Sequence, residues 1–405
     1  MSDTPPDLWQ FVPLRDYQLP GLPARSAANN AWGSFKQLFR RPKADPAPFK
    51  QDKELSSLAE VRLAHLVAPI PNAALAKALE LALHDWLEEK AANRACRFVI
   101  SQPFCPQQQT LQSLAQHHQA PIIAAPTHHQ ILDNDPSWFN AWPSEAGFWV
   151  LPHLEHCYLR QAAGLNLLRQ LFHRLDQGEL GKGLIACDSW AWAYLQHILP
   201  LPRGQALTLQ AFDAERLQRL FSQMVQPQAG RQVRFSNATT GRDIICVPSE
   251  QARPPGEELV QLAAYCRGNV ALALHYWRER LRSEPDASLD TDAKDAANAD
   301  QDSASSPLFE ENLWVTQMLP EPNLPVGNSE EQILMLHALL LHGGLDAAML
   351  AGVLPLSPNR SAAVLSQLYR AGLIGRQGPG WYLRPSAYAS VRRLLRVQDY
   401  LVDEF

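Results

Sequence analysis

An unbroken apolar run at residues 147–151 constrains the fold of this chain more than any other feature. The run, GFWVL, has no polar alternate position, so it fits a strand covered on both faces. A second run of this kind lies at residues 183–187, and leucines recur between the two at three- and four-residue steps from Leu165 to Leu175. A buried strand, an amphipathic helix and another buried strand predict a parallel βαβ unit.

A second unit of the same kind precedes the first one. Residues 97–101 and 121–125 are apolar and strand-like, and residues 111–118 between them have a helical pattern. Four strand candidates that alternate with helices predict a three-layer α/β domain with a parallel sheet, and its ligands are expected at the carboxyl ends of the strands.

At 405 residues, the chain is longer than one hydrophobic core usually supports, so several domains are expected. We predict a proline-rich N-terminal segment at 1–53, an α/β domain at 54–206, a helical lid at 207–282, an acidic disordered linker at 283–307 and a winged-helix domain at 308–405. The linker contains seven acids and one lysine among alanines and serines, so it cannot bury enough apolar surface to order itself.

The last hundred residues have the pattern of a winged helix. Three helical stretches at 330–342, 346–353 and 357–371 are followed by two short strands around the Gly378-Pro379-Gly380 turn. DNA is one expected partner of such a domain. The side chains that we expect to face it are Asn359, Arg360, Gln367, Arg370 and Arg376.

Net charge and targeting signals narrow the function classes. The formal net charge is −5, and without the linker the remainder is close to neutral, which argues against a strongly basic nucleic-acid binder. The chain contains no apolar run long enough to span a membrane and no signal peptide at its start, so a cytoplasmic location is expected.

A basic amphipathic stretch lies within the N-terminal segment. Trp32, Phe35 and Phe39 fall on one helical face, while Arg40 and its basic neighbours supply charge. Such a stretch suits an anionic membrane surface or an acidic partner groove, and the alternative is a short helix packed on its own domain.

The order of these parts resembles the AAA+ and STAND class of P-loop ATPases. The lid contains Cys266-Arg267-Gly268-Asn269-Val270, in which Gly268-Asn269 match the first two residues of that class's Gly-Asn-Pro step. The resemblance covers roughly residues 55–400. It implies a nucleotide near Asn269, near Thr110 after the first strand, and near Asp188 and Ser189 after a later one.

The residues that bind and hydrolyse ATP in that class are replaced here. The turn after the first strand reads Pro103 to Thr110, with Gln108 where a glycine is needed and Gln109 where the lysine is needed. The strand at 147–151 ends in Pro152-His153 instead of acids, and Glu155 comes two residues late. The resemblance therefore implies a pseudo-ATPase, in which ATP is not expected to bind in the ordinary way.

Metal binding and nucleophilic catalysis are two further possibilities. His153, His156 and Cys157 lie within one turn and suit metal ligation. Polar residues are common at a helix start after a proline, however, and no further ligand can be identified, so no metal site is predicted. Ser189 lacks the Gly-x-Ser-x-Gly pattern of a hydrolase nucleophile, so no catalytic residue is predicted.

These observations predict a non-catalytic scaffold or regulatory adaptor that binds a protein partner. One alternative is a switch with an atypical nucleotide site, and another is a DNA-binding regulator that uses the winged helix.

Overall fold

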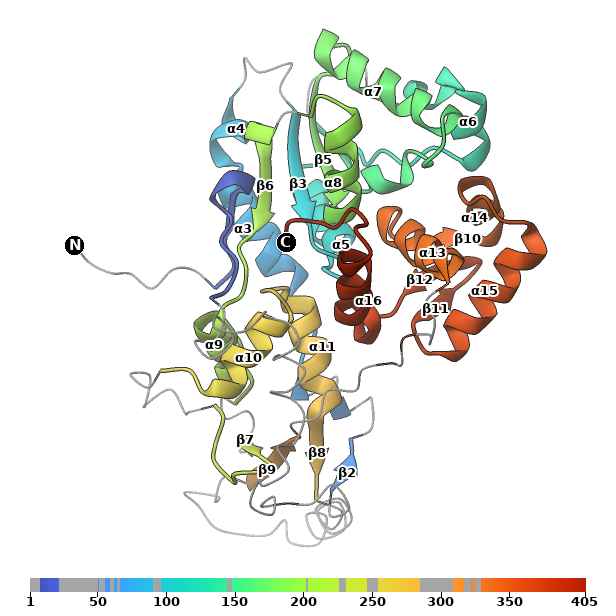
Figure 1. Cartoon of the computed structure of the whole chain (residues 1–405). Coiled ribbons are helices and arrows are strands. Elements are labelled where there is room, and N and C mark those ends of the chain that lie inside the picture. The colour runs from blue at the N-terminus through green and yellow to red at the C-terminus, as the bar shows by residue number, and fades with distance from the viewer. Residues whose placement is uncertain are drawn as a thin grey trace, which may run out of the picture. The chain divides into compact units, whose positions relative to one another are not determined.

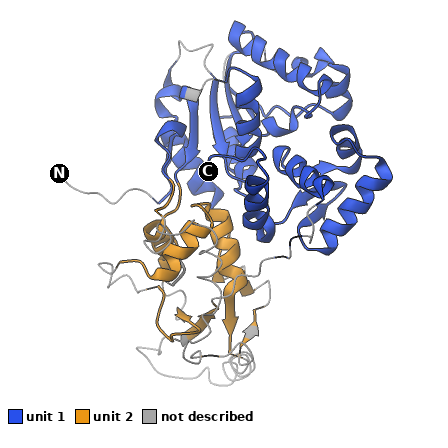
Figure 2. Ribbon diagram, viewed as in Figure 1, with its two compact units in different colours: residues 1–18, 71–210, 321–405 blue, residues 19–70, 211–320 orange. Residues whose placement is uncertain are grey.

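The computed structural model describes most of the chain. The described residues are 8–21, 50, 55–58, 62–63, 66–89, 96–143, 148–201, 203–225, 231–245, 254–284, 309–316, 322, 324 and 329–405. The chain divides into two compact units (Figure 2). Unit 1 comprises residues 1–18, 71–210 and 321–405, and unit 2 comprises residues 19–70 and 211–320.

Unit 1 has a five-stranded sheet and a second, three-stranded one (Figure 1). The strands of the larger sheet are β1 (Phe11–Pro13), β3 (Cys96–Ser101), β4 (Phe148–Leu151), β5 (Lys182–Asp188) and β6 (Ala206–Leu209). The helices beside it are α3 (Asn72–Ala82), α4 (His84–Glu88), α5 (Gln107–His117), α6 (His128–Asp133), α7 (Asn166–Gln177) and α8 (Ser189–Ile198). Short 3-10 turns are η1 (Leu14–Asp16), η3 (Pro136–Ala141), η4 (Leu154–His156), η5 (Ala163–Leu165) and η6 (Arg203–Gln205).

The strand order is β1-β6-β3-β5-β4, and the pairings from β6 to β4 are parallel. Ile122 forms a parallel bridge with Val150, which adds the predicted strand at 121–125 to the far edge as a short contact only. In chain order the parallel strands are β3, the short strand at 121–125, β4, β5 and β6. The first of them therefore lies between the fourth and the fifth, and the second lies at the edge. This arrangement is P-loop NTPase-like, and it confirms the predicted α/β class.

Helices cover both faces of this sheet, so the domain has three layers. On one face Val99, Val150 and Leu184 pack against α3 and α5 through a buried cluster. On the other face Phe98 and Trp149 pack against α7 and α8. Alternate residues of each strand thus enter opposite cores, which explains why the strands read as unbroken apolar runs.

The edge strands differ from the sequence expectation. β1 lies in the predicted proline-rich N-terminal segment, where no strand of the sheet was expected, and it pairs antiparallel with β6, Phe11 opposite Leu209. β6 crosses the expected boundary at residue 206 because it pairs with β3. Short strands of this length carry little periodicity, so only their pairing defines them.

The winged helix is confirmed. It consists of α13 (Glu330–Leu341), β10 (Leu345–Asp346), α14 (Ala347–Val353), α15 (Pro358–Arg370), β11 (Ile374–Gln377) and β12 (Gly380–Leu383), followed by α16 (Pro385–Val397). β12 pairs antiparallel with both β10 and β11. Ser357 caps α15 by accepting a hydrogen bond from the backbone N–H of Arg360, and Pro358 occupies its first position, as a helix start requires.

Unit 2 contains the predicted lid helices and a four-stranded sheet of order β2-β8-β9-β7. Its elements are β2 (Ser56–Ser57), α9 (Ala214–Val225), β7 (Arg231–Asn237), α10 (Glu257–Tyr265), α11 (Val270–Arg280), β8 (Leu281–Ser283) and β9 (Phe309–Val315). The sequence assigned residues 308–315 to the winged-helix domain, but β9 pairs in parallel with β7 along its whole length. The acidic linker expected at 283–307 lies almost entirely outside the described residues.

A buried ion pair ties α16 to the start of α8 within unit 1. The Asp403 side chain is fully buried, and its carboxylate accepts hydrogen bonds from Arg392 Nε at 2.9 Å and from Ser189 Oγ at 2.6 Å. Arg392 Nη2 also donates to the carbonyl oxygens of Asp403 and Phe405. The Phe405 ring packs on Tyr17, with 4.8 Å between ring centroids. The segment after α16 is therefore held against the α/β layers.

Asp403→Ala is expected to lower the free energy of unfolding by about 3–5 kcal/mol, because it leaves the Arg392 guanidinium buried without its anion. Urea unfolding measures this change. Asp16→Ala is the matched control, since Asp16 and Arg15 form an ion pair whose two side chains are mostly exposed. We expect the control to change stability by less than about 0.5 kcal/mol. Equal effects of the two substitutions would contradict the assignment.

Candidate pocket at the carboxyl edge of the sheet

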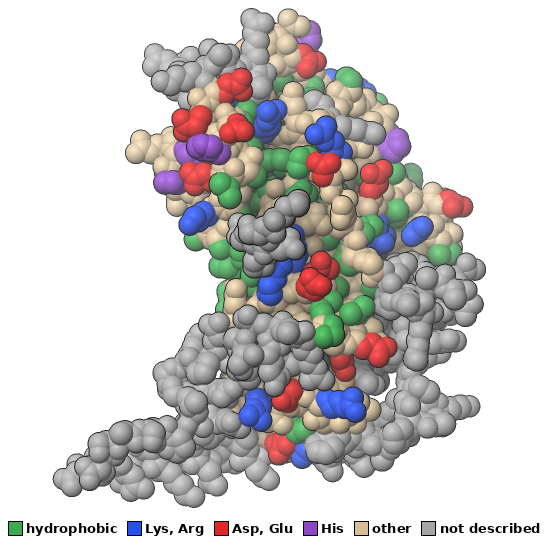
Figure 3. Space-filling model, turned by 90° about the vertical axis from the view of Figure 1, so that its left-hand side faces the viewer, with side chains coloured by type: hydrophobic (Ala, Val, Ile, Leu, Met, Phe, Trp, Pro, Cys, Tyr) green, Lys and Arg blue, Asp and Glu red, His purple; other side chains and the backbone are tan. Residues whose placement is uncertain are grey.

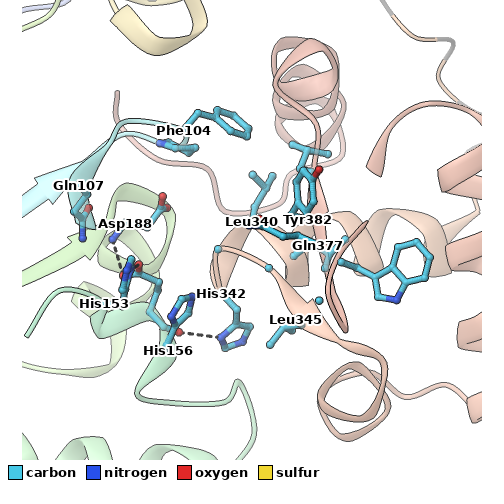
Figure 4. A pocket seen from close by; sticks show the side chains of 18 of the residues that line it. Phe104, Gln107, His153, His156, Asp188, Leu340, His342, Leu345, Gln377 and Tyr382 are labelled. Atoms are coloured by element: carbon cyan, nitrogen blue, oxygen red, sulfur yellow. Dashed lines mark hydrogen bonds and ion pairs between the residues drawn. The ribbon is translucent and has the colours of Figure 1, made fainter. Parts of the chain in front are cut away.

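A cavity of about 760 Å³ lies where the winged helix meets the carboxyl ends of the parallel strands (Figure 4). From the sheet side it is lined by the loops after β3 and β4 and by Asp188 at the end of β5. From the other side it is lined by the end of α13 and by β12. Its size is that of a small-molecule site, and its place is the one where α/β folds bind ligands.

The loop after β3 is closed on itself. The N–H of Cys105 donates to Gln102 O at 3.3 Å, and the N–H of Gln107 donates to Cys105 O at 2.7 Å. Pro103 and Pro106 have no N–H. The Gln107 side chain then donates to Pro152 O at 2.7 Å, which fixes this loop to the end of β4. Several backbone donors that a phosphate would need are absent or already used.

A buried carboxylate lies at the centre of the sheet side. Glu155 is 5% exposed, and its two oxygens accept hydrogen bonds from His153 Nδ1 at 2.7 Å and from the backbone N–H of Asp188 at 3.0 Å. Burial opposes ionisation, but the hydrogen bond from His153 and the charges of His156 and His153 outweigh it and lower the pKa of Glu155.

The pKa of the neighbouring acid, Asp188, is shifted in the opposite direction. Burial, and then the negative charge of Glu155, raise the pKa of Asp188 well above its ordinary value. Its carboxylate also accepts the N–H of Trp190 at 2.8 Å and caps α8. The environment therefore moves the pKa values of the two acids apart, favouring the ionised form of Glu155 and the protonated form of Asp188.

The winged helix contributes a buried histidine to the same cavity. His342 is 1% exposed, and its Nδ1 lies 3.4 Å from the carbonyl oxygen of Glu155. Because a carbonyl only accepts, Nδ1 carries the proton in that contact. The Nε2 of His342 is buried without a hydrogen-bond partner. Tyr158 packs on the ring and donates its hydroxyl to Leu341 O at 2.9 Å.

Of the four residues expected near a nucleotide, Asp188 lines the cavity. The Thr110 side chain is buried, and its hydroxyl donates to Pro106 O at 2.8 Å. The Ser189 hydroxyl is held by Asp403. Asn269 belongs to unit 2, where its side chain accepts the N–H groups of Ala271 and Leu272 and caps α11. Their proposed part in a nucleotide site stays a prediction.

The residues expected to contact DNA or a partner are all exposed on the winged helix. Arg360 is paired with Glu331 on α13, Nε to Oε2 at 2.7 Å, and Gln367 accepts a hydrogen bond from Gln332. Arg376 lies over the Trp381 ring, 5.6 Å from its centroid. The predicted docking segment with Trp32, Phe35, Phe39 and Arg40 lies outside the described residues.

Two residues of the cavity escaped the sequence reasoning. Glu155 follows the strand too late for the usual acidic position, yet the 3-10 turn η4 brings its carboxylate to the end of β5. His342 follows a leucine-rich helix and has no motif around it. Only the position of Glu155, two residues after His153 and one before His156, carried a usable signal.

Comparisons with known proteins give little further information. No protein-family model and no curated protein matches the chain. One match among solved structures is entitled "Structure of the Aeropyrum Pernix ORC2 protein (ADPNP-ADP complexes)". It has 13% sequence identity and a TM-score of 0.30, and it covers 86% of this chain and 97% of that one. The fold class follows from the strand order of the larger sheet.

Hydropathy adds one further observation. Within the described part of the chain, no helix combines the length and the apolar character that crossing a bilayer needs.

The buried histidines predict that stability falls as the solution becomes acidic. Burial lowers the pKa of His342 to about 3 and, helped by the Arg160 charge, that of His337 to about 4. The unfolded chain binds these protons near pH 6.5 and the folded chain does not, so stability is lost as the pH falls below about 6.5. Each histidine should contribute about 2 kcal/mol of loss between pH 7 and 5.

Urea unfolding at pH 7 and pH 5 measures this loss. His342→Gln is expected to reduce the difference between the two pH values, because the glutamine does not titrate. His129→Gln, a substitution of an exposed histidine, is the control and should leave the difference unchanged. If the His342→Gln variant lost as much stability between pH 7 and pH 5 as the wild type, this would contradict the assignment of His342 as a buried histidine that stays neutral in the folded chain.

Proposed function

We propose that this chain is a non-hydrolytic regulatory adaptor with an AAA+/STAND-like P-loop fold, and that it acts through contacts with a protein partner. The observation that carries the proposal is the closed loop at residues 102–110, which occupies the phosphate-binding position of this fold. The pocket there is retained, but its chemistry differs from that of a triphosphate site.

The charges of the side chains that line the cavity also argue against triphosphate binding. Triphosphate binding needs cationic side chains and free backbone N–H groups. None of the described residues that line the cavity is a lysine or an arginine, and Gln109 is neutral where the class has its lysine. The ionised Glu155 would repel a phosphate at the carboxyl edge. The Thr110 hydroxyl, which would hold Mg²⁺, donates to its own helix.

On the winged helix, two exposed arginines and an exposed tyrosine lie around a half-buried tryptophan and offer a partner surface. We name Tyr369, Arg376, Trp381 and Arg384 the Arg-aromatic face. The Tyr369 and Trp381 rings meet edge to face with 5.9 Å between centroids, and Arg376 and Arg384 lie over Trp381 and Tyr369 at 5.6 and 5.7 Å. Tyr369 is 48% exposed. Exposed Arg, Trp and Tyr are enriched at binding hot spots, and this charge suits an acidic protein segment.

DNA is the second candidate partner, because Arg370 is exposed near the Arg-aromatic face and adds to its positive charge. One observation weakens that candidate: Glu331 neutralises Arg360 on the helix expected to read DNA. The side drawn in Figure 3, which is turned away from the winged helix, carries interspersed acidic and basic side chains and does not bear on this comparison. A protein partner is therefore the favoured function.

Titration with nucleotides tests the loss of the phosphate site. Isothermal titration with ATP, ADP and GTP, each with Mg²⁺, is expected to show no heat of binding, and millimolar nucleotide should not shift the melting temperature. Asp188→Asn and Asn269→Ala are the matched variants. A melting shift in the wild type that disappears in either variant would overturn the proposal and favour an atypical nucleotide switch.

Substitutions on the Arg-aromatic face test the partner surface. Arg376→Glu and Trp381→Ala are expected to abolish capture of a protein partner from extracts of the source cells, a loss of at least about tenfold. Arg169→Glu, on the exposed side of α7, is the charge-matched control and should keep the partner.

Fluorescence anisotropy with labelled duplex DNA is expected to show no binding at about 0.15 M salt. Tight, salt-dependent DNA binding that Arg376→Glu removes would favour the DNA-binding function instead.

A further inference from the structure

The turn after β4 brings together three side chains that suit a metal ion. His153, Glu155 and His156 each offer a ligand atom, and these atoms lie within 4.8 Å of one another. All three residues belong to, or directly precede, the 3-10 turn η4, and all three line the cavity. The two imidazole rings are stacked, with 4.8 Å between centroids and 24° between planes.

The carboxylate of this group is held in place before any ion arrives. One oxygen of Glu155 accepts the backbone N–H of Asp188, so the other, Oε1, is directed to His153. His342 fixes the same turn by its contact with the Glu155 carbonyl. Such outer contacts are what orient metal ligands in known sites.

We propose that His153, Glu155 and His156 bind a divalent metal ion of the zinc type, with the remaining coordination position open toward the cavity. Two imidazoles and one carboxylate suit Zn²⁺ and its neighbours Co²⁺ and Ni²⁺, whereas Mg²⁺ and Ca²⁺ prefer oxygen ligands alone. Three protein ligands leave one position for water or for a donor atom of a bound molecule. This inference uses the same Glu155 carboxylate as the proposed function but does not rest on that function, because the positions of the three ligand side chains carry it.

The hydrogen bond between His153 and Glu155 is compatible with this site. Its proton occupies the space between two ligand atoms, and a metal ion takes the place of that proton when it binds. Cys157 is not part of the ligand set, because its thiol contacts the His153 carbonyl oxygen at 3.2 Å.

A second cluster provides a matched control. His117 at the end of α5 and His118 directly after it lie 3.2 and 2.8 Å from Glu80 on α3, so the residue types are the same. Neither histidine nor Glu80 lines the cavity, and both histidines are exposed. A site of this kind on the outer surface lacks the enclosed carboxylate that distinguishes the turn after β4.

The experiment is a metal titration of the full chain after treatment with a chelator. Isothermal titration with Zn²⁺ gives stoichiometry and affinity, and visible absorption with Co²⁺ reports a site of low coordination number without thiolate ligands. The variants are His153→Gln/His156→Gln and, as control, His117→Gln/His118→Gln. His156 is exposed and the His153 side chain is 24% exposed, so the first variant is expected to fold, which a thermal melt verifies.

We expect the wild type and the control to bind Zn²⁺ at the turn after β4 and to show the Co²⁺ absorption. The His153→Gln/His156→Gln variant should no longer bind this Zn²⁺ ion tightly, with the affinity reduced on the order of 100-fold or more. The proposal is overturned if the wild type binds no Zn²⁺, if the variant keeps the wild-type affinity and stoichiometry, or if only the control loses binding.

Discussion

The buried pair of Arg392 and Asp403 is the interaction on which the arrangement of unit 1 depends. A fully buried carboxylate is costly unless charge and hydrogen bonds satisfy it, and Asp403 receives both from Arg392 and Ser189. Arg392 comes from α16, and Ser189 begins α8 on the sheet. The pair therefore joins the helix after the winged helix to the carboxyl edge of β5, and Trp190 adds a hydrogen bond to the Tyr388 hydroxyl at 3.0 Å.

The cavity follows from this connection. With the winged helix held beside the sheet, the end of α13 covers the region where parallel strands present their polar termini. His342 and Tyr158 close the contact around the turn after β4, because each has a hydrogen bond that crosses between the two parts. The result is an enclosed site with a buried carboxylate and imidazoles, a setting that supports charge-assisted contacts better than open surface does.

The P-loop NTPase-like fold does not depend on the chemistry of the loop after β3. Strand order and layer packing depend on apolar residues in β3, β4 and β5, which are intact. The loop after β3 needs only to satisfy its own backbone groups, and Cys105, Gln107 and Thr110 do so locally. The fold and the chemistry at its edge are thus physically separable.

The sequence by itself determined the central βαβ units and the three helices and the hairpin of the winged helix, and it predicted that the loop after β3 is not a phosphate loop. Those features depend on local periodicity and on turn residues such as Gly378, which can be recognised within a short stretch of sequence. Tertiary structure decided the short strands β1, β6 and β9, the partners of Asp403, and the meeting of Glu155 with His342. These depend on contacts between segments distant in the chain. No local pattern encodes which distant residue supplies a hydrogen bond or covers a buried charge.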